Sequence, residues 1–439
     1  MTSARALFFM MFPALVVDAA NGWLIRNVTT TVSISQVYRL TLLGLMLLWL
    51  AKYRKNGFVM LIGCFSLLQI GTLYHSYFYR EYSWLVNDIH FQVRLMLHFA
   101  YFLFFWTYIQ QAIRSSFHIM LYRDFQRLLI FSYTVVVVNI ILGSLGIGYS
   151  TVGKFAVRGE QGYGGLGFFK AGNDVSATFL LIAGVMMYWI WNGRKGINRY
   201  FTFGLFSVLM AVLLQTKTII VGMLILFGGI PLLTSGLILS QMRIKKRPFV
   251  ISTLVVVIVL CISVFLELSD AGIMQRFRYL NERSGLTFAL LTGRGYFLDL
   301  AVTLLEKSYG FLDILFGHGW SYYLQEMGYL YGKDKLVEID YIDIFMISGL
   351  SGLILQLSIW TFYLLMAYRS VRISSLGKVV LFIDLLLLGV AGTAGHVLYS
   401  TLNSMFVGLI NTLPFIEYAI TSQSNQNLES EAGHVTIHP

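Results

Sequence analysis

The sequence predicts an all-α integral membrane protein with about twelve transmembrane helices. Of its 439 residues, 57% are hydrophobic and 12% are charged, whereas soluble domains average about 45–50% and about 25%. A water-soluble core of this chain could not bury so much apolar surface, so the lipid bilayer must surround most of it. The apolar residues also form helix-length runs, and basic residues gather in alternate loops between these runs.

Helices that cross a bilayer need about 20 predominantly apolar residues, and the chain contains a series of such runs. In chain order, the predicted spans cover residues 6–24, 31–51, 57–75, 91–113, 128–148, 172–191, 200–215, 218–239, 248–268, 339–368, 379–398 and 401–420. Their helix ends are the least certain part of the prediction. Cys64 and Cys261 lie far apart inside apolar runs, which is typical of core residues rather than of a disulfide or a metal site.

Basic residues mark one side of the membrane. If every predicted span crosses once, one set of loops holds Arg5, Lys52, Arg54, Lys55, Arg114, Arg123, Arg127, Arg194, Lys195, Arg199, Arg243, Lys245, Lys246, Arg247, Arg369, Arg372 and Lys378. Asp124 is the only acidic residue among these loops. Short loops rich in Lys and Arg stay in the cytoplasm, so both termini are predicted to be cytoplasmic. The net charge of +11 is therefore attributed to topology and not to nucleic-acid binding.

The prediction divides the chain into a single transmembrane domain, residues 1–420, and a polar tail, residues 421–439. Two long segments fall on the outer side, at residues 149–171 and 269–338. The second contains two amphipathic stretches, residues 296–305 and 311–316, which predict short helices on the outer membrane surface. A cap that lies on the lipid without any chemistry of its own is the alternative interpretation.

Several cations lie on the outer side, against the usual rule. They include Arg158, Lys217, Arg276, Arg278 and Arg294, and long loops escape the rule in part. Lys217 stands between two apolar runs with almost no loop. It either reaches back to the interface with its long side chain or faces a cavity that holds an anion.

Carboxylates gather at the start of the predicted span 339–368. Asp340 and Asp343 are three residues apart, which places them on one helix face, and Glu338 precedes them. They could simply stabilise the helix N-terminus. Alternatively, a carboxylate there accepts a proton from a hydroxyl group, while the cations bind a phosphate or pyrophosphate. Together these two groups would suit glycosyl transfer from a pyrophosphate-linked donor at the outer leaflet.

Five segments, in this order, resemble the Wzy/WaaL superfamily of bacterial polysaccharide polymerases and O-antigen ligases. They are residues 167–174 (GFFKAGND), 215–218 (QTKT), 292–297 (TGRGYF), 315–319 (LFGHG) and the acidic run that leads into 345–352 (FMISGLSG). Their order and spacing match the family over roughly residues 148–352.

The resemblance implies a polymerase with a GT-C-like architecture in the bacterial inner membrane, with its active site in the periplasm. Its substrate would be an oligosaccharide repeat unit linked to undecaprenyl pyrophosphate, with membrane lipids around it and with a chain-length-regulating membrane protein as a further partner. Neither a metal, a nucleotide nor another cofactor is expected. Arg294, Arg158 and Lys217 would hold the pyrophosphate, with Arg276, Arg278 and His318 as further substrate-binding candidates. Glu338 or Asp340 would be the catalytic base.

Two departures keep alternatives open. Ligases of this superfamily usually carry a histidine where this chain has Glu338 and Asp340, which favours a polymerase over an O-antigen ligase. Lys217 replaces the usual arginine, so that position lacks a bidentate phosphate clamp. A lipid-linked oligosaccharide flippase or another transporter is the alternative from a different class, although carriers tend to have two similar halves, and this sequence shows no such repeat.

Overall fold

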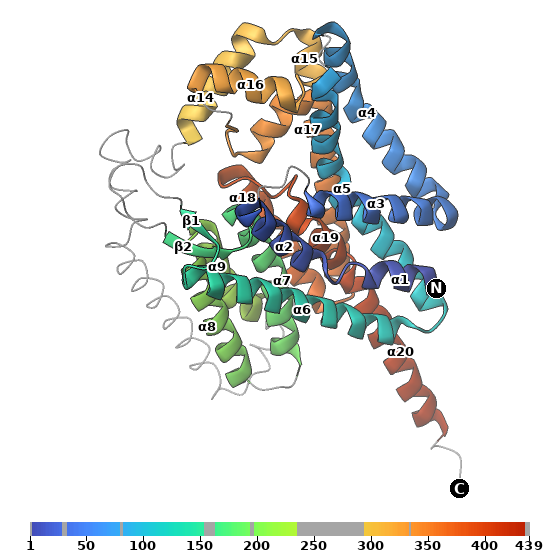
Figure 1. Cartoon of the computed structure of the whole chain (residues 1–439). Coiled ribbons are helices and arrows are strands. Elements are labelled where there is room, and N and C mark those ends of the chain that lie inside the picture. The colour runs from blue at the N-terminus through green and yellow to red at the C-terminus, as the bar shows by residue number, and fades with distance from the viewer. Residues whose placement is uncertain are drawn as a thin grey trace.

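The computed structural model describes residues 2–28, 33–79, 82–152, 163–193, 197–234, 294–332 and 335–434 (Figure 1). Ten helices in this part of the chain are long and apolar enough to cross a membrane, so the prediction of an all-α, multi-pass membrane protein is confirmed. The predicted span 91–113 lies in a long helix that is not among the ten. The predicted span 248–268 lies outside the described residues, so the number twelve stays a prediction.

Apart from short turns, the described part of the first half of the chain is helical except for one hairpin. In chain order its elements are α1 (Thr2–Phe9), α2 (Ala14–Asn27), α3 (Ile34–Tyr53), α4 (Lys55–Tyr79), α5 (Tyr82–Arg114), α6 (His118–Ser144), β1 (Tyr149–Val152), β2 (Tyr163–Gly167), α7 (Gly172–Asn192), α8 (Ile197–Leu214) and α9 (Lys217–Thr234). The predicted first span is split into α1 and α2, and Pro13, which has no N–H to donate, immediately precedes α2.

The hairpin lies in the predicted outer segment 149–171. Its strands β1 and β2 pair antiparallel, with Tyr149 opposite Gly167 and Val152 opposite Tyr163. Just after β2, the Phe168 N–H donates to the side chain of Asn139 on α6 (3.1 Å). A small β-sheet therefore adds to the helical fold at the end of the bundle where the sequence predicts the outer face.

The second half begins with a helical cap. Its elements are α14 (Arg294–Ser308), α15 (Phe311–Phe316), α16 (Trp320–Tyr331), α17 (Asp340–Ser370), α18 (Ser375–Thr393), α19 (Thr401–Ile410) and α20 (Leu413–His434). Helices α14, α15 and α16 lie together at the top of the molecule in Figure 1, and α15 contacts both α4 and α17. The two amphipathic stretches predicted to be short helices are thus confirmed as parts of α14 and α15.

Helix α17 is kinked where the cap meets it. Gly349 interrupts the helix with φ 64° and ψ −167°, a conformation that is essentially restricted to glycine. The carbonyl groups of Met346 and Ile347 accept hydrogen bonds from the backbone N–H groups of His318 (3.2 Å) and Gly319 (3.0 Å). The turn that joins α15 to α16 therefore docks on the kink.

The chain is also broken between α18 and α19. Helix α18 ends at Thr393, whereas the sequence predicts a span up to residue 398. Residues 394–400 are not helical, and the short helix α19 then begins at Thr401. Non-helical backbone near a membrane is stable only where other protein groups or water satisfy its N–H and C=O groups. This segment, residues 394–400, is called the unwound segment below.

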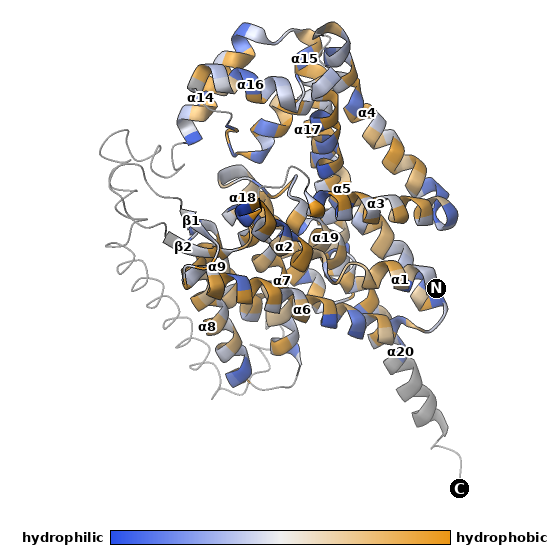
Figure 2. Ribbon diagram, viewed as in Figure 1, coloured by the Kyte–Doolittle hydropathy of each residue, from blue (hydrophilic) through white to orange (hydrophobic). Residues whose placement is uncertain are grey.

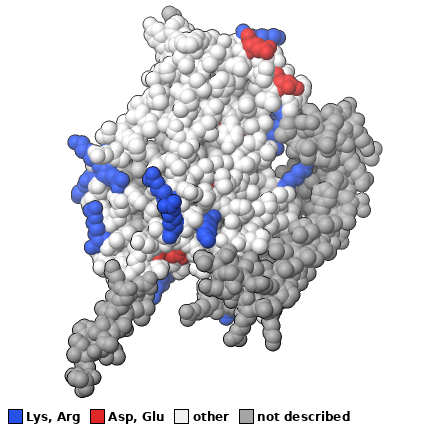
Figure 3. Space-filling model, turned by 180° about the vertical axis from the view of Figure 1, so that it is seen from behind, with Lys and Arg blue, Asp and Glu red and all other residues white. Residues whose placement is uncertain are grey.

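The interior and the surface have the character of a membrane protein. Helix α19 is buried along almost its whole length, and many large apolar side chains elsewhere are exposed, such as Leu48 and Leu73. Apolar residues dominate the helices of the bundle, while polar residues are more frequent in the cap (Figure 2). On the face in Figure 3 most of the described surface is uncharged, and most Lys and Arg side chains lie in a band across its middle, below the cap.

Buried charges between helices are paired with neighbours. Arg39 on α3 forms an ion pair with Asp18 on α2, and both side chains are almost fully buried, as is usual for charges inside membrane-spanning helices. Asp384 on α18 instead accepts a hydrogen bond from the side-chain amide of Asn411 (3.2 Å).

Candidate functional site

The unwound segment is held by one aspartate. Asp340, the first residue of α17, is fully buried, and its two carboxyl oxygens accept the backbone N–H groups of His396 (2.5 Å), Val397 (2.7 Å) and Leu398 (2.8 Å). These three donors have no helical partner, because α18 has already ended. The side chain of Asp340 thus replaces the missing helix and fixes the backbone of the segment.

Asp343 fixes the neighbouring loop in the same way. It is fully buried and accepts the N–H groups of Val337 (3.1 Å) and Glu338 (3.0 Å). The hydroxyl groups of Tyr323 and Tyr399 lie 3.4 Å from its two oxygens. The predicted pair of aspartates on one helix face therefore anchors two loops, residues 335–339 and the unwound segment, against each other.

Two residues in these loops have strained backbone conformations. Glu338 has φ 62° and His396 has φ 63°, in the left-handed region that non-glycine residues seldom adopt. Gly395 directly precedes His396 and packs against Glu338, so that a Cβ atom at Gly395 would come within 2.5 Å of the Glu338 carbonyl oxygen. Strain of this kind costs of order 1–3 kcal/mol per residue and is frequent at functional sites. The contact between residues 335–339 and the unwound segment is therefore a candidate functional site.

Arg294 and Glu338 meet at the start of the unwound segment. The Arg294 guanidinium lies 3.0 Å from the Glu338 carboxylate and donates to the carbonyl groups of Thr393 and Ala394 (3.1 Å each). These carbonyls belong to the end of α18, where backbone acceptors lack helical partners and a cation is favourable. The ion pair is partly open, since 13% of the Arg294 side chain and 30% of the Glu338 side chain are exposed. The Lys335 ammonium lies 3.9 Å from the same carboxylate.

Two more arginines contact the other end of the segment. Arg94 on α5 donates from Nε to the Tyr399 carbonyl (3.2 Å), and its guanidinium lies 6.0 Å from the centre of the Trp320 ring. Arg39 donates to the Thr401 carbonyl in addition to its ion pair with Asp18. Cations thus bind the backbone at both ends of the unwound segment.

A basic cavity opens beside Arg39 and Arg94. Its volume is about 290 Å³, and its basic lining comes from Arg39, His90, Arg94 and Lys170. The remaining lining residues are polar or apolar and include no carboxylate: Asn21, Ile25, Ser33, Ser35, Gln36, Leu40, Val93, Leu97 and Thr401. Among the described residues, neither Arg94 nor Lys170 forms an ion pair. The cavity has the chemistry of an anion site, because charged donors and hydroxyl groups line it and no carboxylate does. Of its two arginines, Arg39 is already paired with Asp18 behind the lining, so Arg94 and Lys170 supply the cationic groups that have no acidic partner among the described residues.

The predicted site residues are therefore placed unequally. The structure brings Arg294 and Glu338 into contact. Asp340 holds the unwound segment, whose Ala394 carbonyl binds Arg294. Lys217 is the exposed first residue of α9 and is not part of the cavity lining. His318 is buried in a separate cluster with Asp313 and His75. Arg158, Arg276 and Arg278 lie outside the described residues.

Sequence reasoning missed Arg94 and His90. Both lie within a few residues of the start of the predicted span 91–113, and an ionisable residue inside a span is a functional candidate by default. That signal was present in the sequence. By contrast, the association of these residues with Lys170 and Arg39 depends on how two separate helices, α5 and α3, and a loop pack together.

Compared with known proteins, the chain matches no protein-family model and no curated protein sequence.

Proposed function

We propose that this protein is a Wzy-type polysaccharide polymerase that joins undecaprenyl-pyrophosphate-linked oligosaccharide units at the outer face of the inner membrane. The basic cavity is the observation that carries the proposal. It offers two arginines, a lysine and a histidine without a lining carboxylate, next to a bundle of apolar helices in which a polyprenyl chain can lie. A lipid diphosphate combines the two chemistries that this arrangement favours.

The Arg294–Glu338 ion pair supplies the catalytic part of the proposal. Arg294 and Glu338 do not line the cavity, so the proposal requires the bound donor to extend from the cavity to this ion pair. There its diphosphate competes with Glu338 for the Arg294 guanidinium, and the released carboxylate can accept the proton of the acceptor sugar hydroxyl. That hydroxyl attacks the anomeric carbon as the bond to the diphosphate breaks, so undecaprenyl pyrophosphate leaves with its charge stabilised by the cations. A single displacement of this kind inverts the anomeric centre.

Asp340 has a positioning role in this proposal. Its carboxyl group is fully buried and already accepts three backbone N–H groups, so it is poorly placed to take a proton from a substrate. It holds the unwound segment, whose first carbonyl group, that of Ala394, binds Arg294. Of the two predicted bases, Glu338 is therefore preferred.

The test is polymerisation by the purified full-length protein in proteoliposomes, supplied with a lipid-pyrophosphate-linked repeat unit. We expect Glu338→Gln and Arg294→Ala each to lower the rate about 100- to 1,000-fold, the loss typical when a donor that stabilises a developing anion is removed. Arg127→Ala is the matched control, because Arg127 also pairs with an acid, Asp124, but its side chain is 69% exposed. Chain growth at near-normal rates in both site variants would refute the site.

The same preparation separates the alternative functions. Transfer of a glycan to lipid A core, without growth of longer chains, would indicate an O-antigen ligase. Movement of the intact lipid-linked unit across the vesicle membrane, without formation of a glycosidic bond, would indicate a flippase. A chain-length-regulating membrane protein, if it is a partner, should change the length of the product and not the identity of the bond.

A further inference from the structure

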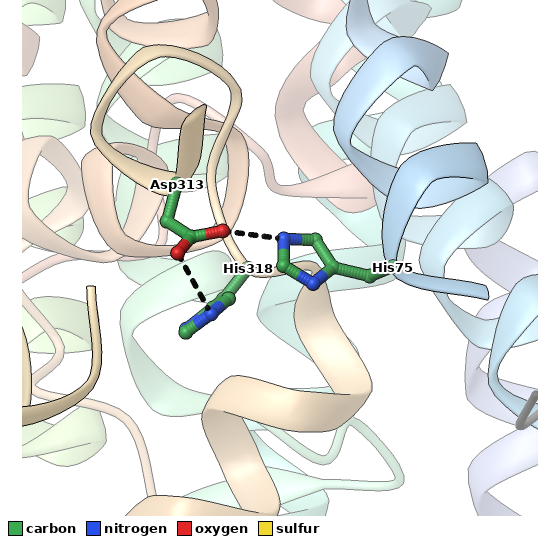
Figure 4. Close-up of side chains that lie close together, drawn as sticks. All are labelled: His75, Asp313 and His318. Atoms are coloured by element: carbon green, nitrogen blue, oxygen red, sulfur yellow. Dashed lines mark ion pairs between the residues drawn. The ribbon is translucent and has the colours of Figure 1, made fainter. Parts of the chain in front are cut away.

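Two histidines and one aspartate converge where the cap meets α4. His75 lies on α4, Asp313 on α15, and His318 in the turn between α15 and α16 (Figure 4). The Asp313 carboxylate lies between the two imidazoles, with one oxygen 2.8 Å from Nε2 of His75 and the other 3.3 Å from Nε2 of His318. One potential ligand atom from each residue lies within 4.8 Å of the other two.

The cluster is buried, and two of its residues have polar atoms with no partner outside the cluster. His75 is 3% exposed and His318 is 1% exposed. Apart from the contacts with Asp313 and His75 given above, neither ring nitrogen of His318 nor the Asp313 oxygen nearest His75 makes a hydrogen bond within the described part of the chain. The other Asp313 oxygen accepts the Gly310 N–H (2.7 Å). Buried polar atoms nearly always have a partner, and those that lack one within the protein point to a bound ion or water.

The backbone around the cluster is fixed by tight packing. The His318 N–H donates to the Met346 carbonyl at the kink of α17, and the rings of Tyr309 and Tyr322 lie 4.2 Å from the His318 ring, centre to centre. One turn before His75, a Cβ atom on Gly71 would come within 2.2 Å of the Phe316 carbonyl oxygen. The turn therefore rests directly on the backbone of α4, which holds the three side chains at a set separation.

Two imidazoles and one carboxylate are ligands that suit a transition metal. Zinc binds histidine nitrogen at about 2.0–2.1 Å and carboxylate oxygen at about 2.0–2.2 Å, which in a tetrahedron separates the ligand atoms by about 3.3 Å. The two observed N···O distances, 2.8 and 3.3 Å, are close to that separation. Magnesium and calcium instead prefer sites made of oxygen ligands.

We propose that His75, Asp313 and His318 bind one divalent transition-metal ion of the zinc class, which fastens the turn between α15 and α16 to α4. A water molecule would complete the tetrahedron. The ion would hold the cap against the membrane helices and is given no part in glycosyl transfer. The proposal is thus independent of the proposed function.

Metal analysis of the full-length protein in detergent tests the proposal. The protein is stripped with a chelator, loaded with Zn²⁺ in the presence of excess Mg²⁺, freed of unbound metal, and measured by elemental mass spectrometry. We expect about one zinc per wild-type chain, and at least about tenfold less in His75→Ala and in His318→Ala. Asp313→Asn keeps the shape of the side chain, so it provides a second test if an alanine variant fails to fold.

His118→Ala is the matched control, because His118 is similarly buried, at 4% exposure, but lies at the start of α6. It should retain the wild-type zinc content. Gel filtration and circular dichroism establish that each variant is folded before its metal is counted. Two results would overturn the proposal: wild-type protein that holds no zinc after loading, or an equal zinc content in the wild type and in all three site variants. The first result would leave a metal-free histidine–aspartate cluster, and the second would place the metal elsewhere on the chain.

Discussion

The substitution Asp340→Asn separates positioning from catalysis at the candidate site. Asparagine has nearly the same shape as aspartate, but one of its two terminal groups is an NH₂ donor in place of an acceptor oxygen. In the wild type, one Asp340 oxygen accepts the His396 N–H and the other accepts the N–H groups of Val397 and Leu398. Whichever way the amide turns, at least one backbone N–H of the unwound segment then faces another donor.

The expected cost follows from that single conflict. The amide should turn so that it loses only the His396 bond, because the opposite orientation loses two. A typical hydrogen bond contributes about 0.5–1.5 kcal/mol, and a buried donor without an acceptor costs about 1–3 kcal/mol. Asp340 is fully buried, so water cannot relieve the conflict. The free energy of unfolding should therefore fall by about 2–4 kcal/mol.

The measurement is denaturant unfolding of the purified protein in detergent, followed by tryptophan fluorescence, with polymerisation assayed on the same preparations. Glu338→Gln should show the opposite pattern: a loss of stability below about 1 kcal/mol, since its ion pair is partly exposed, together with a large loss of rate. Asp299→Asn on the exposed face of α14 is the matched control and should stay within about 0.5 kcal/mol of wild type.

A clear result would refute this reasoning. If Asp340→Asn unfolds with the wild-type free energy and yet abolishes polymerisation, Asp340 acts on the substrate and not on the unwound segment. If both Asp340→Asn and Glu338→Gln leave stability and polymerisation intact, neither carboxylate belongs to a site.

Three further predictions concern the cap and the cavity. Gly349→Ala should lower the free energy of unfolding by more than about 3 kcal/mol in the same titration. Alanine disfavours this backbone conformation, and its Cβ would lie 2.4 Å from the Gly317 nitrogen. A change below about 1 kcal/mol would contradict the conclusion that the kink at this position requires glycine. Asp88 lies on α5 ahead of the predicted span, and burial raises the pKa of its carboxyl group to about 6. Because the folded state then binds this proton more tightly than the unfolded state does, the free energy of unfolding should fall as the pH rises from about 4 to about 6. The variant Asp88→Asn should lack that part of the pH dependence. Arg94→Gln should weaken the binding of polyprenyl pyrophosphate about tenfold or more, as expected when a hydrogen bond to a charged group is lost. Equal affinities of the wild type and the variant would place the diphosphate outside the cavity.

The sequence by itself determined that a lipid bilayer surrounds the chain and that the fold is helical. Apolar runs of about 20 residues are stable inside a bilayer, where a helix satisfies its backbone hydrogen bonds within each run. Ten of the predicted spans accordingly recur as helices that can cross a membrane. Local chemistry also fixed the short cap helices and placed Asp340 and Asp343 on one helix face. Each of these features depends on residues that are close together in the chain.

Only the tertiary structure decided which side chains meet and what the buried carboxylates do. Asp340 has the residue type of a catalytic base, but in the folded chain its carboxyl group accepts backbone N–H groups 56 to 58 residues away. The basic cavity and the His75–Asp313–His318 cluster likewise join helices that are far apart in the sequence. No local pattern encodes such contacts, because they arise from the packing of whole helices and from the ends at which their hydrogen bonding fails.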